Sequence, residues 1–424
     1  MVLLKGEIRV LTRWILFSCM LIICSANAET AQQVFNHYQK SLLQIQVIEK
    51  NTQQKYSYGS GFFVSPELVI TNYHVLSDLI EYPDRYDLVA KVGEARLQSL
   101  EIMYLDVIND LALLKAPDKT NIYFNLAESL PEQGAPVFSL GNPHDLGMVV
   151  VPGTYNGFKQ HSFYPRLHLT GSINSGMSGG PSVNGDGLVI GVNVATGGNQ
   201  LGFIVPVDQV KELLGKLPEH EVDLEVLHAQ IHSQLILNQN SMMKPLLEGD
   251  WDMQSLGSGV IPENIASYIS CWGSANPSSS EYELRTSTAF CRLSEDVFLS
   301  DRFVTGKIQM QFEWVDGSNL PFIKFNHHYQ KKIAGARANN KASHQDVTEF
   351  KCQSDIVDIN EHPTRTVYCI RGYKNFPDLY DTVYLAATVP KDKYGFIRRF
   401  SLAGVSKENT QAFTRKFMES VVWQ

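Results

Sequence analysis

The chain has 424 residues, of which 44% are hydrophobic and 19% are charged, values that are ordinary for a soluble globular protein. This length leaves room for two or three domains with sizeable cores. The net charge of −8 argues against nucleic acid or anionic lipid as the main partner, because both are bound by basic patches.

The N-terminal segment, residues 1–28, has the pattern of a secretory signal peptide. Basic residues precede an apolar run, Trp14–Cys24, and the small-residue sequence Ala-Asn-Ala ends at Ala28. The run is too short to cross a bilayer, which needs about 20 residues. We expect cleavage after Ala28 and a periplasmic or secreted protein with no later membrane span. An uncleaved anchor and a lipoprotein built on Cys24 are alternatives, although the bulky Ile23 disfavours the second.

The region from Val34 to Pro206 has a β pattern, in which short apolar runs alternate with glycine, asparagine and proline. Regularly spaced short strands of this kind predict a barrel or a sandwich. The runs are GSGFFVS, LVITNYHVL, DLALLKA, APVFSLGN, GLVIGVNVA and LGFIVPV. A helix is expected over PVDQVKELLGKL, and a second one over residues 222–247 as a linker between domains.

Beyond Gly249 the sequence predicts an α+β region of strand-like runs and a terminal helix, without a functional motif. In that helix Phe413, Phe417 and Val421 recur four residues apart behind Asn409, which we expect to be the N-cap. The segment NHHYQKK is interpreted as a solvated loop rather than a metal site.

Four cysteines lie in this C-terminal half, and the other two lie in the predicted signal peptide. Export into an oxidising compartment and an even count predict two disulfides, with local pairing favoured among three connectivities. Four reduced, buried thiols are the alternative. The expected pairs are Cys271–Cys291 and Cys352–Cys369.

The sequence GMSGGP presents Ser178 as a candidate nucleophile, which needs a base, a group that orients the base, and donors for an oxyanion. His74 ends a predicted strand and could present its ring to a cleft. Asp110 precedes an apolar strand, where a partly buried carboxylate needs a partner such as an imidazole N–H. The N–H groups of Gly176 and Ser178 could supply the two donors. Asp106 is a second carboxylate, interpreted as a solvated loop residue.

The order His, Asp, Ser resembles the chymotrypsin-like fold, and the motifs resemble the HtrA/Deg branch of exported serine proteases over about residues 33–216. The resemblance implies two six-stranded barrels and a serine endopeptidase that acts on polypeptides without a metal or cofactor. It also implies that His74 is the general base, that Asp110 orients it, and that Ser178 is the nucleophile, with Gly176 and Ser178 forming the oxyanion hole. The matching motifs are GSGFFVS, TNYHV, DLALLK, GNP, INSGMSGGP, VIGVN and GFIVPV.

Two departures from trypsins bear on activation and specificity. Met177 stands where trypsins have the aspartate that binds a new N-terminus, so we expect activity without propeptide cleavage. A neutral serine stands where trypsins bind lysine or arginine, which favours small or aliphatic P1 residues, because an unpaired buried charge is costly. A strand edge in GVNVA is expected to pair with the substrate backbone. The expected substrate-binding residues are Ser172, Ile173, Gly191, Val192, Asn193 and Val194.

The expected organisation is mainly β: a double β-barrel protease domain (29–217), a helical linker (218–248) and a disulfide-containing α+β domain (249–424). No PDZ-like loop follows the linker, so peptide-triggered activation and cage assembly are not expected. Oligomerisation is open, because the segment before Ser57 has no feature that supports trimers. The alternative function is a catalytically silent binding or chaperone-like protein on a protease scaffold.

Overall fold

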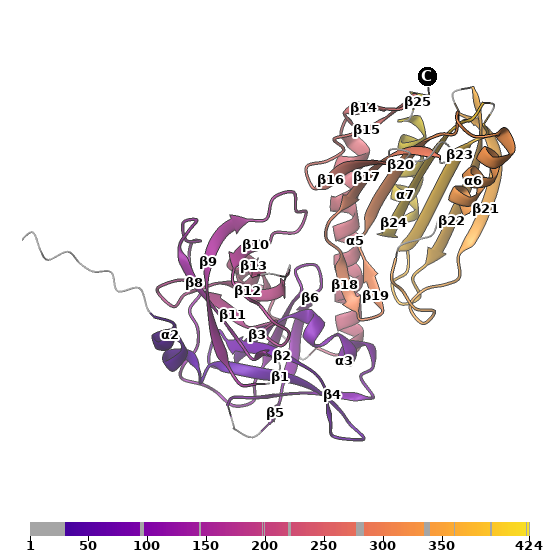
Figure 1. Ribbon diagram of the computed structural model, residues 1–424. Coiled ribbons are helices and arrows are strands. Elements are labelled where there is room, and N and C mark those ends of the chain that lie inside the picture. Colours follow the sequence, from indigo (N-terminus) through magenta and orange to yellow (C-terminus); the bar gives the residue numbers. More distant parts are fainter. Residues whose placement is uncertain are drawn as a thin grey trace, which may run out of the picture.

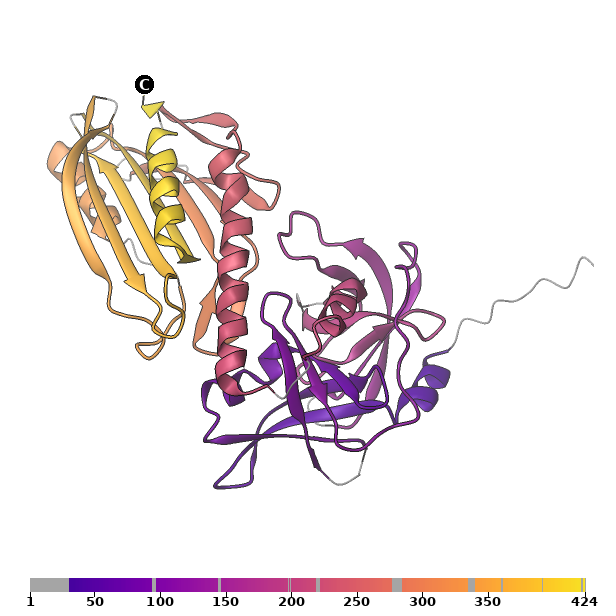
Figure 2. The same ribbon diagram turned by 180° about the vertical axis from the view of Figure 1, so that it is seen from behind.

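The computed structural model describes residues 30–93, 97–143, 146–196, 198, 200–218, 222–276, 284–334, 340–359, 361–390, 392–420 and 422–423. The predicted signal peptide and Val421 lie outside these residues. Two halves are joined along the long helix α5 (Leu224–Glu248), as Figures 1 and 2 show from opposite sides. Within the described residues, no helix has the length and apolar character needed to span a membrane.

The first half opens with a short helix that the sequence reading had not assigned, and continues into an antiparallel sheet. Helix α2 (Ala31–Tyr38) begins with a capping box on Thr30. The sheet has seven strands in the order β5-β4-β1-β2-β3-β7-β6, rather than the closed six-stranded barrel that the resemblance implied. Its strands are β1 (Leu42–Glu49), β2 (Lys55–Phe63), β3 (Leu68–Thr71), β4 (Tyr86–Lys91), β5 (Gln98–Ser99), β6 (Glu101–Asp106) and β7 (Leu111–Lys115).

The second sheet is a closed barrel of six strands in the order β10-β13-β12-β11-β8-β9. Buried residues of both sheets, such as Phe62 and Val192, share one apolar cluster, and helix α4 (Val207–Leu214) adds Val210 and Leu213 to it. This shared core holds the two sheets face to face, as expected for a double-barrel protease fold. The strands are β8 (Pro136–Gly141), β9 (Val149–Phe158), β10 (Leu167–Thr170), β11 (Pro181–Val183), β12 (Val189–Thr196) and β13 (Leu201–Pro206).

The predicted linker helix is present as α5 and is part of two cores. Its N-cap Asp223 accepts a hydrogen bond from the Val226 N–H at 2.9 Å. The buried residues of its first half, Leu227, Ile231 and Leu235, join a cluster in which residues of the first sheet meet residues of the C-terminal half. Those of its second half, Met242, Met243 and Leu246, join the cluster of the C-terminal sheet.

The C-terminal half is α+β, as expected, with a seven-stranded antiparallel sheet between helices (Figure 1). Helices α5 and α7 (Lys407–Glu419) pack on one face with Phe400, and α6 (Phe322–Ala334) packs on the other with Leu385. The sheet contains β16 (Ile269–Asn276), β17 (Arg285–Leu293), β20 (Ile308–Asp316), β24 (Tyr394–Val405), β23 (Tyr380–Thr388), β22 (His362–Gly372) and β21 (Lys351–Ile359), in that order. A smaller sheet has β14 (Met253–Leu256), β15 (Gly259–Pro262) and β25 (Val422–Trp423).

Two local predictions in this half are wrong. The segment NHHYQKK belongs to helix α6, because Phe325 and Tyr329 lie four residues apart and are buried against the sheet. The N-cap of α7 is Ser406, whose hydroxyl accepts from the Asn409 N–H at 3.3 Å. Asn409 therefore lies inside the first turn of the helix.

The local disulfide pairing is confirmed. Cys271 and Cys291 are opposite each other on β16 and β17, and Cys352 and Cys369 are opposite on β21 and β22. Because β16 and β21 are the two edge strands, each disulfide joins an edge strand to its inner neighbour.

Candidate active site

His74 and Asp110 come together at the ends of neighbouring strands. His74 lies in the 3-10 turn η1 (Tyr73–Val75) after β3, and Asp110 lies in the turn between β6 and β7. The Nδ1 of His74 is 2.7 Å from Oδ2 of Asp110, and the His74 backbone N–H donates to Oδ1 at 2.9 Å. A carboxylate that accepts from Nδ1–H leaves Nε2 as the basic nitrogen.

The backbone of Asp110 is held in the left-handed region, with φ of 61°. Aspartate tolerates this conformation better than most residues. The buried Asn72 donates from Nδ2 to the Asp110 carbonyl at 2.7 Å and so fixes the turn. Asp106 is buried rather than solvated, and it accepts from the backbone and side chain of Asn109 within the same turn. Asp106 therefore has a structural role.

Opposing influences act on the pKa of His74. Burial lowers it, whereas the charge of Asp110, its hydrogen bond and the charge of Asp301 raise it, and the net result is a raised pKa. The carboxylate of Asp110 therefore makes the imidazole a stronger base than it would be in an apolar setting.

Ser178 lies in a tight turn that the first sheet holds in place. The Ser60 N–H donates to the Ser178 carbonyl at 2.8 Å, and the Ser60 hydroxyl donates to the Gly176 carbonyl at 2.7 Å. Gly179 has φ of 83°, and a Cβ there would collide with the Ser60 carbonyl and lie 3.0 Å from the Asn72 nitrogen. The turn is thus pressed against the segment that leads to His74.

The donors expected of an oxyanion hole are available. Among the described residues, neither the Gly176 N–H nor the Ser178 N–H donates to a partner. The Ser178 hydroxyl donates to the Val194 carbonyl at 3.2 Å, and no hydrogen bond within the described part joins it to His74. Rotation about the Cα–Cβ bond of the serine would turn its hydroxyl from the Val194 carbonyl toward His74.

The structure changes the expected substrate contacts. Ile173 is 3% exposed and packs in an apolar cluster of the second barrel, whereas Ser172 is half-buried beside it. The segment from Gly191 to Asn193 is hydrogen-bonded on both sides, since it pairs with β13 and with β11 or the turn after Ser178. Gly191, Val192 and Asn193 therefore cannot pair with a substrate backbone. The open edge begins at Val194, where β12 has a bulge against β13.

The C-terminal half reaches this site through a hairpin of β18 (Val297–Ser300) and β19 (Phe303–Thr305). The ring of Phe298 lies edge-on to the His74 imidazole, with centroids 6.0 Å apart. The adjacent Tyr73 hydroxyl donates to the Leu299 carbonyl at 2.8 Å. No motif in either segment predicts this contact.

Sequence reasoning also missed Ser60 and Asn72 as supports of the site. Both lie in motifs on which the resemblance depends, GSGFFVS and TNYHV, so the signal was present in the sequence. The sequence does not show, however, which groups the side chains of Ser60 and Asn72 bind. Among the described residues, no group of histidine, cysteine and carboxylate side chains could hold a metal ion.

Comparison with known proteins defines the class. Residues 59–192 match the family described as trypsin-like peptidase domain, so this part of the chain is similar to trypsin-like serine proteases. The chain is also similar to serine proteases of the HtrA and DegP type. It is 32% identical over 174 residues to human serine protease HTRA4, which covers 39% of this chain and 36% of that protein. It is 30% identical over 175 residues to a probable periplasmic serine endoprotease DegP-like protein of Bartonella henselae. The match covers 38% of this chain and 34% of that protein.

Periplasmic serine endoprotease DegP of Escherichia coli K12 is 27% identical over 202 residues, which are 43% of this chain and 41% of DegP. The chain thus spans less than half the length of these relatives. Among solved structures, the active form of the Rv3671c protease of M. tuberculosis aligns with a TM-score of 0.41 and 21% identity, over 47% of this chain and 92% of that one.

Proposed function

We propose that the chain is an exported serine endopeptidase that acts through His74, Asp110 and Ser178. Ser178 Oγ attacks the peptide carbonyl carbon while its proton passes to His74 Nε2, and the N–H groups of Gly176 and Ser178 stabilise the oxyanion. Collapse of the intermediate transfers the proton to the leaving amine and leaves an acyl-enzyme, which water hydrolyses with His74 again acting as base. The observation that carries the proposal is the 2.7 Å contact between His74 Nδ1 and Asp110 Oδ2 behind the serine turn.

The P1 preference proposed is small or aliphatic. Support comes from the half-buried Ser172, which has no charge to pair with a lysine or arginine side chain. Burial of Met177 in the same cluster supports activity without a new N-terminus, because packing rather than an ion pair holds the turn. The exported location is likewise a proposal, supported by the pattern of residues 1–28.

A catalytically silent binding or chaperone-like protein is the second candidate. It is favoured by the orientation of Ser178, whose hydroxyl points to the Val194 carbonyl. Labelling with a fluorophosphonate probe separates the two functions. If the chain is a protease, we expect a covalent adduct on Ser178 that is absent from Ser178→Ala. An unlabelled native chain would favour the catalytically silent binding or chaperone-like protein.

A further inference from the structure

The β18–β19 hairpin is anchored to the segment that carries His74. Its buried residues Val297, Leu299 and Phe303 belong to the same apolar cluster as Val75 and Leu76, which directly follow the histidine. The hairpin is therefore part of the apolar core that packs against the segment after His74.

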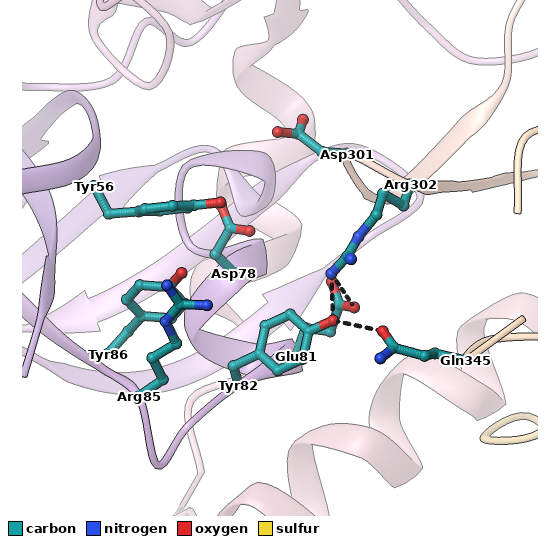
Figure 3. A pocket seen from close by; sticks show the side chains of 9 residues that line it. All are labelled: Tyr56, Asp78, Glu81, Tyr82, Arg85, Tyr86, Asp301, Arg302 and Gln345. Carbon is teal, nitrogen blue, oxygen red and sulfur yellow. Dashed lines mark hydrogen bonds and ion pairs between the residues drawn. The ribbon is translucent and has the colours of Figure 1, made fainter. Parts of the chain in front are cut away.

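Polar contacts fix the hairpin at two further points. The Tyr73 hydroxyl, next to His74, donates to the Leu299 carbonyl in a fully buried hydrogen bond. At the tip, Arg302 contacts Glu81, the last residue of α3 (Ser77–Glu81), and the hydroxyl of Tyr82, the next residue, as Figure 3 shows. The Tyr82 hydroxyl also donates to Gln345 at 3.0 Å.

These anchors place one aromatic ring against the imidazole. Phe298 packs on the shared cluster, and its ring stands at 78° to that of His74, in an edge-to-face arrangement. Asp110 fixes the Nδ1 side of the imidazole, whereas the described residues give Nε2 no hydrogen bond. A ring packed against the imidazole would restrict its rotation about Cβ–Cγ.

We propose that Phe298 is a positioning residue for His74, so that the C-terminal half supplies part of the support for the catalytic base. The inference rests on the proposed peptidase function. A displacement of the base by about 1 Å can cost about 10²-fold in rate, so an imidazole held by a neighbouring ring should transfer the proton more efficiently than a free one. The C-terminal half then acts as a built-in activator of the protease half.

The test compares Phe298→Ala, Phe298→Tyr and the control Phe290→Ala in the full chain. Phe290 is also half-buried, but it stacks on Trp272 within the C-terminal sheet. With a peptide substrate that the native chain cleaves, we expect Phe298→Ala to lower kcat about tenfold with little change in KM, since proton transfer rather than binding is affected. Phe298→Tyr should restore most of the rate, and Phe290→Ala should match the native chain. Unchanged kcat, or a higher kcat, in Phe298→Ala would overturn the proposal.

An NMR titration of His74 gives a readout that does not depend on turnover. Asp110 and Asp301 are the charged groups that act on this imidazole, and both remain in Phe298→Ala. Loss of the phenyl ring should remove its ring-current shift from the His74 protons and raise the pKa of His74 further, because burial lowers that pKa. Unchanged His74 signals would refute the positioning role. Failure of the proposed function would instead appear as an unlabelled Ser178 in the native chain.

Discussion

At the scale of single residues, the proposed mechanism makes the charge of Asp110 decide at which pH His74 can act as a base. The imidazole accepts a proton only in its neutral form, so activity is present above its raised pKa and is lost as the pH falls through it. Asp110→Asn removes the charge and the charged hydrogen bond, whereas the burial that lowers the pKa remains. We expect a loss of about 10⁴-fold in kcat/KM and an acid limb at lower pH than in the native chain. The pH dependence of kcat/KM measures both effects, and an unmoved acid limb would contradict the role given to Asp110.

Ser60 supports the proposed oxyanion hole from the first sheet. Its hydroxyl donates to the Gly176 carbonyl and accepts from the Asn142 N–H at 2.9 Å, so it fixes the peptide group next to the donor turn. Ser60→Ala leaves two buried groups without this partner, which should cost about 1–3 kcal/mol of unfolding free energy. We also expect slower fluorophosphonate labelling, by about tenfold, because the Gly176 peptide is no longer held.

The matched control is Ser41→Ala, which also removes a buried hydroxyl that donates to a carbonyl, that of Ile122. It should lower stability by a similar amount, as measured by urea unfolding, without slowing the labelling of Ser178. If both variants labelled at the native rate, Ser60 would have no part in the oxyanion hole.

At the scale of elements, the edge strand β21 depends on its disulfide. Most of its side chains are exposed, so hydrogen bonds to β22 and the Cys352–Cys369 bond are its main attachments. Removing a disulfide that closes a loop of this length costs about 3 kcal/mol. In the double variant Cys352→Ser/Cys369→Ser, we expect the amide hydrogens of β21 to exchange much faster than in the native chain, while those of β24 stay protected.

The comparison for this prediction is Cys271→Ser/Cys291→Ser, whose Cys291 is fully buried in the core of the sheet. That variant should lose more unfolding free energy and leave β21 protected. Hydrogen exchange followed by mass spectrometry distinguishes the two patterns, and equal protection of β21 in all three proteins would contradict the prediction.

Features that depend on a short contiguous segment can be predicted from the sequence, whereas contacts between residues far apart in the sequence cannot. The strand in GSGFFVS and the proposed triad residues lie in short contiguous patterns, so the sequence alone predicts them. Helix α6 was missed because its buried stripe is only Phe325 and Tyr329 among charged and polar neighbours. The hairpin contact was not predictable, because Leu299 and its partner Tyr73 lie 226 residues apart and each is an ordinary residue in its own segment.

At the scale of the whole molecule, helix α5 couples the two halves. Besides its apolar residues in both cores, Gln234 donates from Nε2 to the Leu105 carbonyl at 2.6 Å and accepts from the Val107 N–H at 2.9 Å. The helix thus pairs with the edge strand β6 and its following residue, beside the turn of Asp110. A rigid connection of this kind explains how a hairpin of the C-terminal half can hold a fixed place at His74.

The shared helix predicts that the two halves unfold in one cooperative transition. Ile231→Asp places an unpaired carboxylate in the cluster where α5, the first sheet and the β18–β19 hairpin meet, where Ile231 is 1% exposed, and should cost about 3–5 kcal/mol. Loss of this shared contact should let the two halves unfold separately, so that calorimetry shows two transitions in place of one, because Met242 still anchors the helix to the C-terminal sheet. Val226→Asp, on the exposed side of the same helix at 45% exposure, should keep the single transition. Two transitions in the native chain would show that α5 connects the halves without coupling them.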